Sequence, residues 1–575
     1  MHINPTSLLK LLTPVLLGIA MMQGSTSSAA AADAPKIGNA DEAARAFLDH
    51  CEAKVRPLEI TLNRAWWDAN TTGKDEAFAA KVAAENKYDE ALADEEQFAT
   101  LKAIKEAGPK DPLLARQIDV LYRIYLEKQV DPDLLKRIAS KANEIEQAFN
   151  VYRAKLNGKE ITDSEARRVL KESKDSAQRQ AVWESGKGVG AAVAEDLRQL
   201  VLLRNEAARR AGFADFHAMR LFLAEQDQAE VLKLFDQLDE LTREPFAKAK
   251  AEIDVALADY CGIPVDELQP WHYQDPFFQE APAISGVSLD SVFADTDIQA
   301  ICRRFYAGIG LPIEDVLARS SLYEEPGKSP HAFCTDITRT GDDVRVLANI
   351  VPNEYWMGTM LHELGHSVYS SKNIPDTLPY TLRTDAHILC TEGVAMMFER
   401  FSKSGEWLQA MGVTVPDPKA YSAAGAQMRR HQLLIFSRWC QVMLRFEQQM
   451  YAEPGQNLND LWWRLVEKYQ LIKRPAGRDA PDYAAKIHVV SAPCYYHNYM
   501  MGQLFACQVH ATIARDVLGA SDIPNAFYTD DKRVGQYMQS RVFAPGATLS
   551  WNALTKHATG EDLNAKAFAA EFAAD

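Results

Sequence analysis

The most informative stretch of this chain is Met360-Leu361-His362-Glu363-Leu364-Gly365-His366-Ser367. His362 and His366 lie four residues apart, so on a helix they share one face and offer two imidazole nitrogens to one metal ion. The bare motif also fits a helix with two surface histidines and an ordinary glutamate. The surrounding residues are strongly apolar, however, and buried histidines without partners would be costly. We therefore predict a buried helix that carries a metal site.

A third ligand is found downstream in Thr391-Glu392-Gly393. A catalytic zinc site uses three protein ligands and leaves a fourth position for water, and Glu392 is the best candidate for the third ligand. Glu363 then lies beside the water. Zinc lowers the pKa of that water toward 7, and a neighbouring carboxylate can take its proton during attack on a peptide carbonyl. The pattern predicts peptide hydrolysis with one Zn²⁺ per chain.

Length and composition indicate a large globular protein. The chain has 575 residues, of which 47% are hydrophobic and 25% charged, so it can bury a sizeable core. Its formal net charge of −16 argues against nucleic acid as a partner. The 8 cysteines lie scattered without CxxC spacing, which argues against a structural zinc cluster and leaves disulfide pairing open.

The first 32 residues have the pattern of an export signal. Lys10 precedes an apolar run over residues 11–22, and small residues lead to Ala30-Ala31-Ala32. A membrane anchor is the alternative, but the run is shorter than the roughly 20 residues of a span and contains Pro14. We expect a signal peptide over residues 1–32 and a single catalytic domain over 33–575. The mature protein would then be periplasmic or secreted, without a stable membrane anchor.

Helical patterns dominate the remaining sequence. From about residue 40 to 260, apolar positions recur at helical spacing among Ala, Leu, Glu, Lys and Arg, with breaks at Asp131-Pro132 and Gly158. Strand signal is sparse, but residues 343–350 alternate after a turn. We predict a mostly α-helical fold with a short β segment just before the histidine helix. The edge of such a strand can pair with an extended peptide, although an ordinary short hairpin fits equally well.

With these residues in view, the chain resembles the M2 metallopeptidase family, the angiotensin-converting-enzyme-like peptidyl dipeptidases, in a bacterial single-domain form. Beyond the metal motif, several stretches resemble the family in the family's own order: residues 65–71, 203–209, 212–215, 462–465, 486–488 and 495–499. The resemblance implies a gluzincin in which two helical halves surround a deep cleft that admits short peptides. It also implies release of C-terminal dipeptides, and we expect the protein to be a monomer.

The resemblance implies roles for the catalytic residues. The zinc ligands would be the two histidines and the glutamate named above, and Glu363 would be the general base and acid. His488 and Tyr499 match the pair that holds the oxyanion of the tetrahedral intermediate. Their chemistry fits this role, because an imidazole N–H and a phenol O–H aimed at developing negative charge stabilise the transition state more than the substrate.

The resemblance also implies residues that bind the peptide. Lys486 and Tyr496 match residues that hold the free C-terminal carboxylate of the substrate. Gln274 is a third carboxylate contact, although its spacing in the sequence differs by one residue from the family's. His331 resembles a residue that lines the cleft, and Ala332 would give main-chain contacts to the peptide.

The chain departs from the family at several positions. Two arginines that bind chloride in the animal enzymes are replaced by Val466 and Asn498, which puts chloride activation in doubt. The family has an acidic residue one turn after the third ligand to orient a zinc histidine, where this chain has Met396. Asp385 or Glu399 could substitute for it.

Two other functions fit parts of the pattern. An oligopeptidase of the thimet-oligopeptidase type shares the zinc motif and the helical cleft but cuts peptides internally. A catalytically inactive peptide-binding relative would keep the fold without the reaction. The presence of Glu363 argues against the inactive relative, because a binding protein does not need a base beside the metal.

Overall fold

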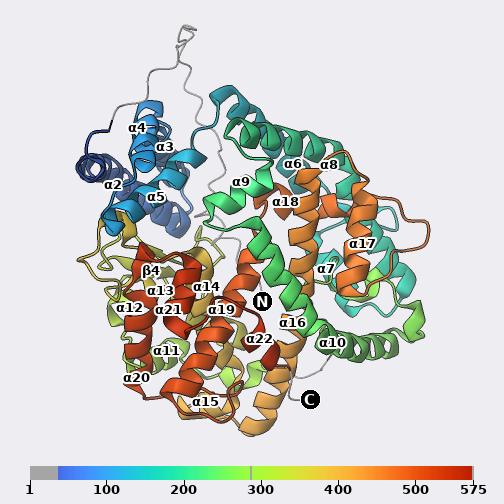
Figure 1. Cartoon of the computed structure of the whole chain (residues 1–575). Coiled ribbons are helices and arrows are strands. Elements are labelled where there is room, and N and C mark those ends of the chain that lie inside the picture. The colour runs from blue at the N-terminus through green and yellow to red at the C-terminus, as the bar shows by residue number, and fades with distance from the viewer. Residues whose placement is uncertain (1–36, 285–287, 573–575) are drawn as a thin grey trace.

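The computed structural model describes residues 37–284 and 288–572 (Figure 1). The export signal predicted for residues 1–32 lies outside the described residues. Helices account for most of the structure, so the predicted mostly α-helical fold with a short β segment beside the histidine helix is confirmed. Within the described ranges, no helix is both long and apolar enough to cross a membrane.

The helices differ widely in length, and the longest precede and follow the metal motif. Before the motif lie α2 (Ala40–Thr72), α3 (Asp75–Leu92), α4 (Glu95–Ala107), α5 (Pro112–Glu127), α6 (Pro132–Val151), α7 (Asp163–Glu172), α8 (Ser176–Arg210), α9 (Phe216–Leu223), α10 (Gln228–Cys261), α11 (Ile298–Gly308) and α12 (Glu314–Arg319). From the motif onward lie α13 (Glu354–Ser370), α14 (Ile388–Glu399), α15 (Gly405–Ala410), α16 (Pro418–Ala452), α17 (Leu458–Gln470), α18 (His488–Ser491), α19 (Tyr496–Thr512), α20 (Lys532–Tyr537), α21 (Trp551–Thr559) and α22 (Lys566–Ala570).

Short helical turns and strands complete the structure. The turns are η1 (Val265–Glu267), η2 (Pro270–His272), η3 (Asp290–Phe293), η4 (Tyr380–Leu382), η5 (Arg400–Lys403), η6 (Asp482–Ala485), η7 (Ile513–Val517), η8 (Met538–Phe543) and η9 (Gly546–Thr548). The strands are β1 (Ala154–Leu156), β2 (Lys159–Ile161), β3 (Phe333–Asp336) and β4 (Val344–Leu347).

Asp-Pro pairs start several helices. Asp111, Asp131 and Asp417 each cap a helix by accepting backbone N–H hydrogen bonds, and a proline follows each of them in the first turn. The aspartate satisfies N–H groups that have no partner within the helix, and proline lacks the N–H that would be unpaired there. The predicted break at Asp131-Pro132 is therefore the start of a helix.

A small hairpin interrupts the helices that the sequence predicts up to residue 260. β1 and β2 pair antiparallel, with Leu156 opposite Lys159. Asn157 and Gly158 between them both have positive φ angles of 53° and 78°. Two such residues form the tight turn that matches the twist of paired strands, so the break at Gly158 is a hairpin rather than a helix junction.

The second hairpin lies beside the histidine helix. β3 and β4 pair antiparallel, with Phe333 opposite Leu347 and Asp336 opposite Val344. Ser321 forms a parallel bridge to Leu347, so β4 is the inner strand and β3 the outer one. Both strands contact α13, and the hairpin therefore packs directly on the helix that carries the two histidines.

The largest apolar core runs from α6 to α22 and is shared by the helices at the right and at the lower left of Figure 1. A separate core lies inside the N-terminal bundle of α2 to α5, where Phe47 and Ile118 are buried. Near the end of α2, Trp66 and Trp67 pack on Phe333 of β3, with ring centroids 4.1 and 6.0 Å apart. Helix α2 thus connects the bundle to the hairpin, and Pro57 lies between these two contacts.

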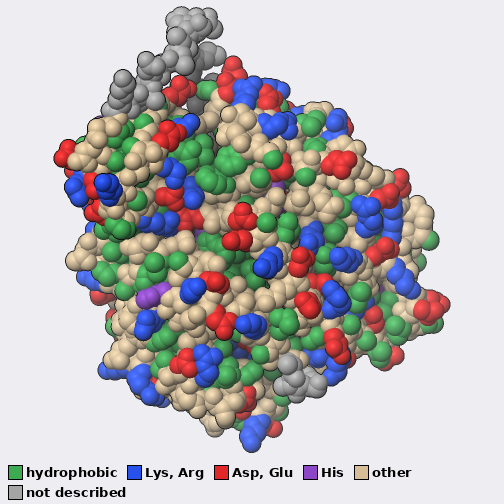
Figure 2. All heavy atoms as spheres, in the orientation of Figure 1, with side chains coloured by type: hydrophobic (Ala, Val, Ile, Leu, Met, Phe, Trp, Pro, Cys, Tyr) green, Lys and Arg blue, Asp and Glu red, His purple; other side chains and the backbone are tan. Residues whose placement is uncertain are grey.

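The surface carries mixed charges. Figure 2 shows acidic and basic side chains interspersed over the visible face, with hydrophobic side chains between them. All eight cysteines lie within the described ranges and carry free thiols, most of them buried. The disulfide pairing that the sequence left open therefore contributes nothing to this structure.

Candidate active site

Helix α13 presents both histidines of the motif on one face. Asn353 caps its N-terminus, and Leu361 and Leu364 are fully buried against the core. His362 and His366 follow each other by one turn, and their Nε2 atoms lie 3.2 Å apart. The local sequence therefore produces the predicted geometry of two converging imidazoles.

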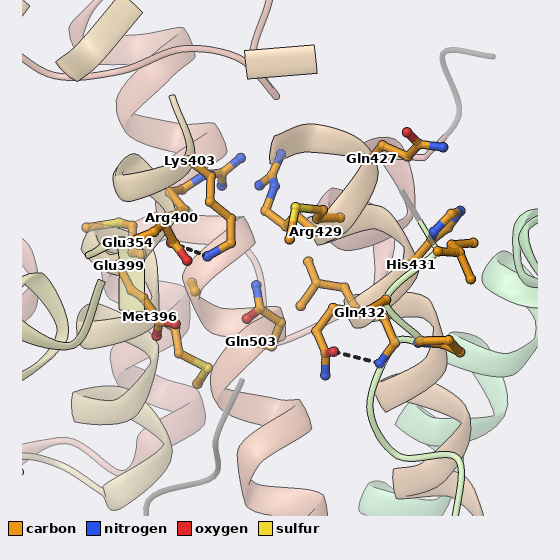
Figure 3. Close-up of a pocket in the computed structure, with 18 of the residues that line it drawn as sticks. Glu354, Met396, Glu399, Arg400, Lys403, Gln427, Arg429, His431, Gln432 and Gln503 are labelled. Carbon is orange, nitrogen blue, oxygen red and sulfur yellow. Dashed lines mark hydrogen bonds and ion pairs between the residues drawn. The ribbon is translucent and has the colours of Figure 1, made fainter. Parts of the chain in front are cut away.

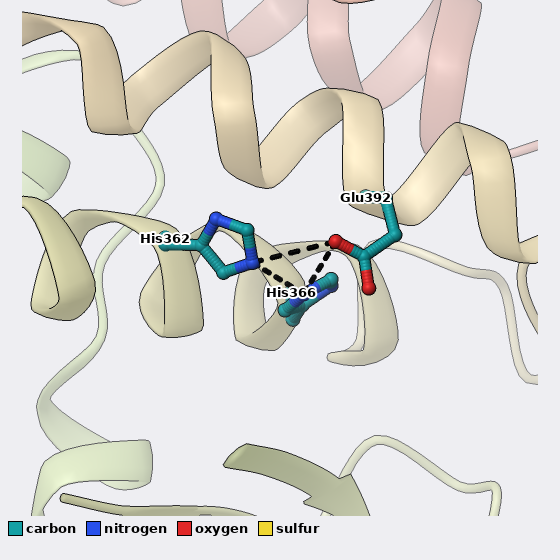
Figure 4. Close-up of side chains that lie close together, drawn as sticks. All are labelled: His362, His366 and Glu392. Atoms are coloured by element: carbon teal, nitrogen blue, oxygen red, sulfur yellow. Dashed lines mark hydrogen bonds and ion pairs between the residues drawn. The ribbon is translucent and has the colours of Figure 1, made fainter. Parts of the chain in front are cut away.

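Helix α14 brings Glu392 to the same point (Figure 4). Its Oε2 atom lies 3.5 Å from His362 Nε2 and 4.0 Å from His366 Nε2, and its side chain is buried. The potential ligand atoms of the three residues all lie within 4.8 Å of one another. Two imidazoles and one carboxylate are a donor set that catalytic zinc sites use, so these residues fit a zinc ion.

Glycines set the spacing of the helices around this point. A Cβ atom at Gly365 in α13 would lie 2.8 Å from the Cα of Ala395 in α14. A Cβ atom at Gly393 would lie 2.7 Å from the carbonyl oxygen of Gly502 in α19. Side chains do not tolerate such short contacts with backbone, so glycine lets α13, α14 and α19 pack closely and in a fixed register.

The outer nitrogen of each histidine has its own partner. His362 Nδ1 lies 3.0 Å from Glu399 Oε2, and His366 Nδ1 lies 2.8 Å from Thr391 Oγ1. Glu399 is one of the two residues that the sequence suggested in place of the acid missing at Met396. The contact from Thr391 was not predicted, because a threonine next to a glutamate ligand has no recognisable spacing.

The two carboxylates make this point electrostatically negative. Burial alone would lower the pKa of His362, but hydrogen bonds and charges from Glu392 and Glu399 raise it well above its usual value. Burial also opposes the charged form of Glu399, yet His362 and Lys403 hold the pKa of Glu399 down to about 2. The arrangement therefore attracts positive charge, which a divalent cation would supply.

Glu363 lies in the middle of the motif. Its side chain is only 3% exposed and follows His362 directly on α13. A carboxylate in this position next to a metal centre can accept a proton from water. Its role as the general base stays a prediction.

Helices α18 and α19 supply the predicted oxyanion pair. His488 starts α18 and Tyr499 lies in α19, and both belong to an aromatic cluster. In this cluster the ring of Tyr496 lies 5.2 Å from His488 and 6.1 Å from Tyr499, while Tyr495 lies 5.0 Å from Tyr499. The buried His488 Nδ1 atom and the Tyr495 and Tyr499 hydroxyls meet no hydrogen-bonding partner among the described residues.

Burial keeps this pair uncharged. Burial and the charge of Lys486 lower the pKa of His488 to about 3, so its imidazole is neutral near pH 7. Burial, together with the charges of Tyr495 and Glu392, raises the pKa of Tyr499 well above its usual value. A neutral imidazole and a phenol both retain a proton to donate, as an oxyanion requires.

Lys486 lies at the other end of the aromatic cluster. Its ammonium group is buried, donates a hydrogen bond to Gln279 Oε1 (2.6 Å) and lies 5.2 to 5.4 Å from the ring centres of Phe277, Trp439 and Tyr496. Burial lowers the pKa of Lys486 to about 8, and Asp275 opposes this shift. The result is a cation held in an aromatic box with one hydrogen-bonding partner.

The loop before this box contains both glutamines of interest. Gln274 is buried with a positive φ of 64°, and its side-chain oxygen accepts a hydrogen bond from the Ala283 N–H (2.9 Å). Gln279, which sequence reasoning missed, is the residue that contacts Lys486. Nothing in the sequence around Gln279 distinguishes it, because the contact depends on how the loop folds back.

The remaining predicted residues lie at the start of β3. His331 is exposed, and Ala332 is buried immediately before the strand. Because β3 is the outer strand, main-chain groups here are near the edge that an extended peptide would approach.

A cavity of about 490 Å³ lies beside Glu399, the partner of His362 (Figure 3). Met396 and Glu399 of α14 line one side, and Gln432 of α16 and residues 281–284 line the other. Glu399 links the cavity to the metal centre, and residues 281–284 follow Gln279, the partner of Lys486, in the chain.

A family model described as angiotensin-converting enzyme, Peptidase_M2, matches residues 39–252 and 290–574. The matched segments contain every predicted site residue except Gln274, which falls in the gap between them. No curated protein matched the chain.

Proposed function

The chain belongs to the M2 metallopeptidase family of angiotensin-converting enzyme and is a zinc-dependent hydrolase, and we propose that it releases dipeptides from the free C-termini of short peptides. The convergence of His362, His366 and Glu392 on one point, with Glu363 beside them, carries this proposal. These residues would hold one zinc ion per chain.

The proposed reaction divides the work between two sides of the site. When bound, zinc would polarise the peptide carbonyl and lower the pKa of the attacking water toward 7. Glu363 takes the proton of this water and returns it to the leaving amine. His488 and Tyr499 donate hydrogen bonds to the carbonyl oxygen as negative charge develops on it.

The position of Lys486 supports a dipeptide as the product. Its ammonium group lies 5.4 Å from the ring centre of Tyr496, whose ring lies 6.1 Å from that of Tyr499. Tyr496 therefore lies between Tyr499, one of the oxyanion donors, and the buried ammonium group of Lys486. An extended dipeptide spans about 7 Å, so a substrate with its carbonyl at Tyr499 can bring its C-terminal carboxylate near Lys486.

We propose that the cavity beside Glu399 accepts a side chain of the leaving dipeptide. It adjoins Glu399, which contacts His362, and Met396 contributes an apolar surface to it. Its lining also carries charged side chains of both signs, namely Glu354, Glu399, Arg400, Lys403 and Arg429, so we propose that the cavity accepts polar side chains of moderate size.

The test is mass spectrometry of the products from an N-terminally blocked pentapeptide and its C-terminal amide, with and without a chelator. We expect chelator-sensitive release of a dipeptide from the free acid and little cleavage of the amide. Equal internal cleavage of both peptides would instead indicate an oligopeptidase of the thimet type. Absence of cleavage with zinc bound would indicate a peptide-binding relative.

We also propose that the protein is exported and is periplasmic or secreted. The support is the signal-like pattern of residues 1–32. N-terminal sequencing of the mature protein from fractionated cells would test this, and a mature chain that starts at Met1 would contradict it.

A further inference from the structure

We infer that Thr391 and Glu399 are positioning residues that tune metal affinity by holding the outer nitrogens of His366 and His362. This inference rests on the proposed function, because it takes the two histidines as zinc ligands. It adds two residues to the site and replaces the acid that the family has at Met396.

The hydrogen bonds define which nitrogen of each histidine faces the metal point. Glu399 is a carboxylate and can only accept, so His362 Nδ1 carries the proton in their 3.0 Å contact. Thr391 Oγ1 can accept from His366 Nδ1 at 2.8 Å in the same way. With Nδ1 held in this way, Nε2 is the atom that each ring directs at the metal point, and the rings cannot turn without losing a hydrogen bond.

One helix supplies all of these partners. α14 carries Thr391, Glu392 and Glu399, while α13 carries His362 and His366. The third ligand and both positioning groups therefore move together. The register of α14 against α13 sets the ligand and both hydrogen bonds at once, and the close contact between the two helices at Gly365 fixes that register.

The shift from Met396 to Glu399 has a structural explanation. Met396 faces α19, because a Cβ atom at Gly502 would lie 2.9 Å from its Cε atom. Glu399 lies almost one turn further along the same helix. A Cβ atom at Gly358 of α13 would lie 3.5 Å from the Glu399 Cγ atom, which is an ordinary contact distance, so the Glu399 side chain packs directly on α13.

The experiment measures zinc affinity directly. Metal-free protein is titrated with zinc in competition with a chromophoric chelator, for the unchanged protein and for Thr391→Val, Thr391→Ser, Glu399→Ala and Glu399→Gln. Thr391→Val and Glu399→Ala should each weaken zinc binding about 10- to 100-fold, as loss of such contacts does elsewhere. Thr391→Ser keeps the hydroxyl and should restore most of the affinity.

Two controls separate positioning from a general loss of structure. Thr555→Val removes a buried hydroxyl that bonds the Trp551 carbonyl (2.8 Å), and Glu59→Gln changes a buried carboxylate that pairs with Arg339 (2.6 Å). Neither should change zinc affinity. The visible absorption bands of the Co²⁺ form should shift in Thr391→Val and Glu399→Ala but not in the controls, because these bands report ligand geometry.

Unchanged zinc affinity and unchanged Co²⁺ bands in both Thr391→Val and Glu399→Ala would overturn the inference while leaving the proposed function intact. A loss in only one of them would overturn the paired assignment. If the unchanged protein binds no stoichiometric zinc, the proposed function fails first. Thermal unfolding of the metal-free variants checks that they fold, and Thr391→Ser keeps the test valid if Thr391→Val does not.

Discussion

The two sides of the site are built differently. On the metal side, each histidine has a partner for its outer nitrogen, in Glu399 or in Thr391. On the facing side, the His488 Nδ1 atom and the Tyr499 hydroxyl are buried without a partner among the described residues. An unpaired buried polar group costs about 1 to 3 kcal/mol. The two histidines are therefore already held in place in the free protein, whereas the facing side keeps hydrogen-bonding groups for what binds there.

The largest effect should come from the base on the metal side. Glu363→Ala should reduce kcat by about 10²- to 10⁴-fold, because the attacking water loses its proton acceptor. Zinc content should stay near that of the unchanged protein, since Glu363 is not a proposed ligand. Steady-state kinetics and metal analysis on one preparation check both statements, and normal turnover would remove Glu363 from the mechanism.

A smaller effect on kcat should come from the facing side. Tyr499→Phe removes one donor to the developing oxyanion and should raise the barrier by roughly 2 to 4 kcal/mol, with KM nearly unchanged. The same change removes a buried hydroxyl without a partner, so the free energy of unfolding should stay equal or increase by up to about 1 kcal/mol. A lower free energy of unfolding together with a normal kcat would show that the Tyr499 hydroxyl stabilises the free protein and does not act in the reaction.

The carboxylate anchor should act on substrate binding. Lys486→Met should raise KM for a peptide with a free C-terminus by about 10- to 100-fold, because a charge-assisted hydrogen bond contributes roughly 1.5 to 3 kcal/mol. The C-terminal amide of the same peptide should bind equally to both proteins. A KM change of the same size for both peptides would show that Lys486 acts through structure instead.

The smallest effect should be a pH dependence of the same anchor. Burial lowers the pKa of Lys486 to about 8, so above pH 8 the free enzyme loses this positive charge. The value of kcat/KM for the free acid should therefore fall by about tenfold per pH unit above 8, toward the level of Lys486→Met. Lys486→Arg keeps its charge and should abolish the decline, whereas a decline that persists in Lys486→Arg would assign it to another group.

The sequence predicted those parts of the site that local periodicity determines. His362 and His366 converge because four residues make about one helical turn, and strand alternation located β4 beside their helix. Contacts between segments that are distant in the sequence were harder to predict. Glu399 was one of two candidates only because the family has an acid at Met396, and choosing between them required the packing of α14.

Contacts that depend on loop paths could not be predicted at all. Gln279 contacts Lys486 from a loop whose course depends on the buried, positive-φ Gln274. The β1–β2 hairpin was missed although Asn157-Gly158 is a strong turn signal, because its strands have only three residues each and long helical patterns surround them. Thr391 was quoted as part of the ligand motif, but its role as a partner of His366 follows from the crossing of two helices.

Helix α2 is attached at both ends and contains a proline between the two attachments. Its 33 residues span about 50 Å, with one end in the core of the N-terminal bundle and the other on β3 through Trp66 and Trp67. Pro57 removes one backbone hydrogen bond between these two attachments, so bending costs least at that joint. Because α5 of the bundle also contacts α9 and η9, a swing of the bundle would have to break these contacts and either flex α2 at Pro57 or carry β3 with it. The strand edge that would pair with a peptide is thus mechanically linked to helices more than 200 residues earlier in the chain.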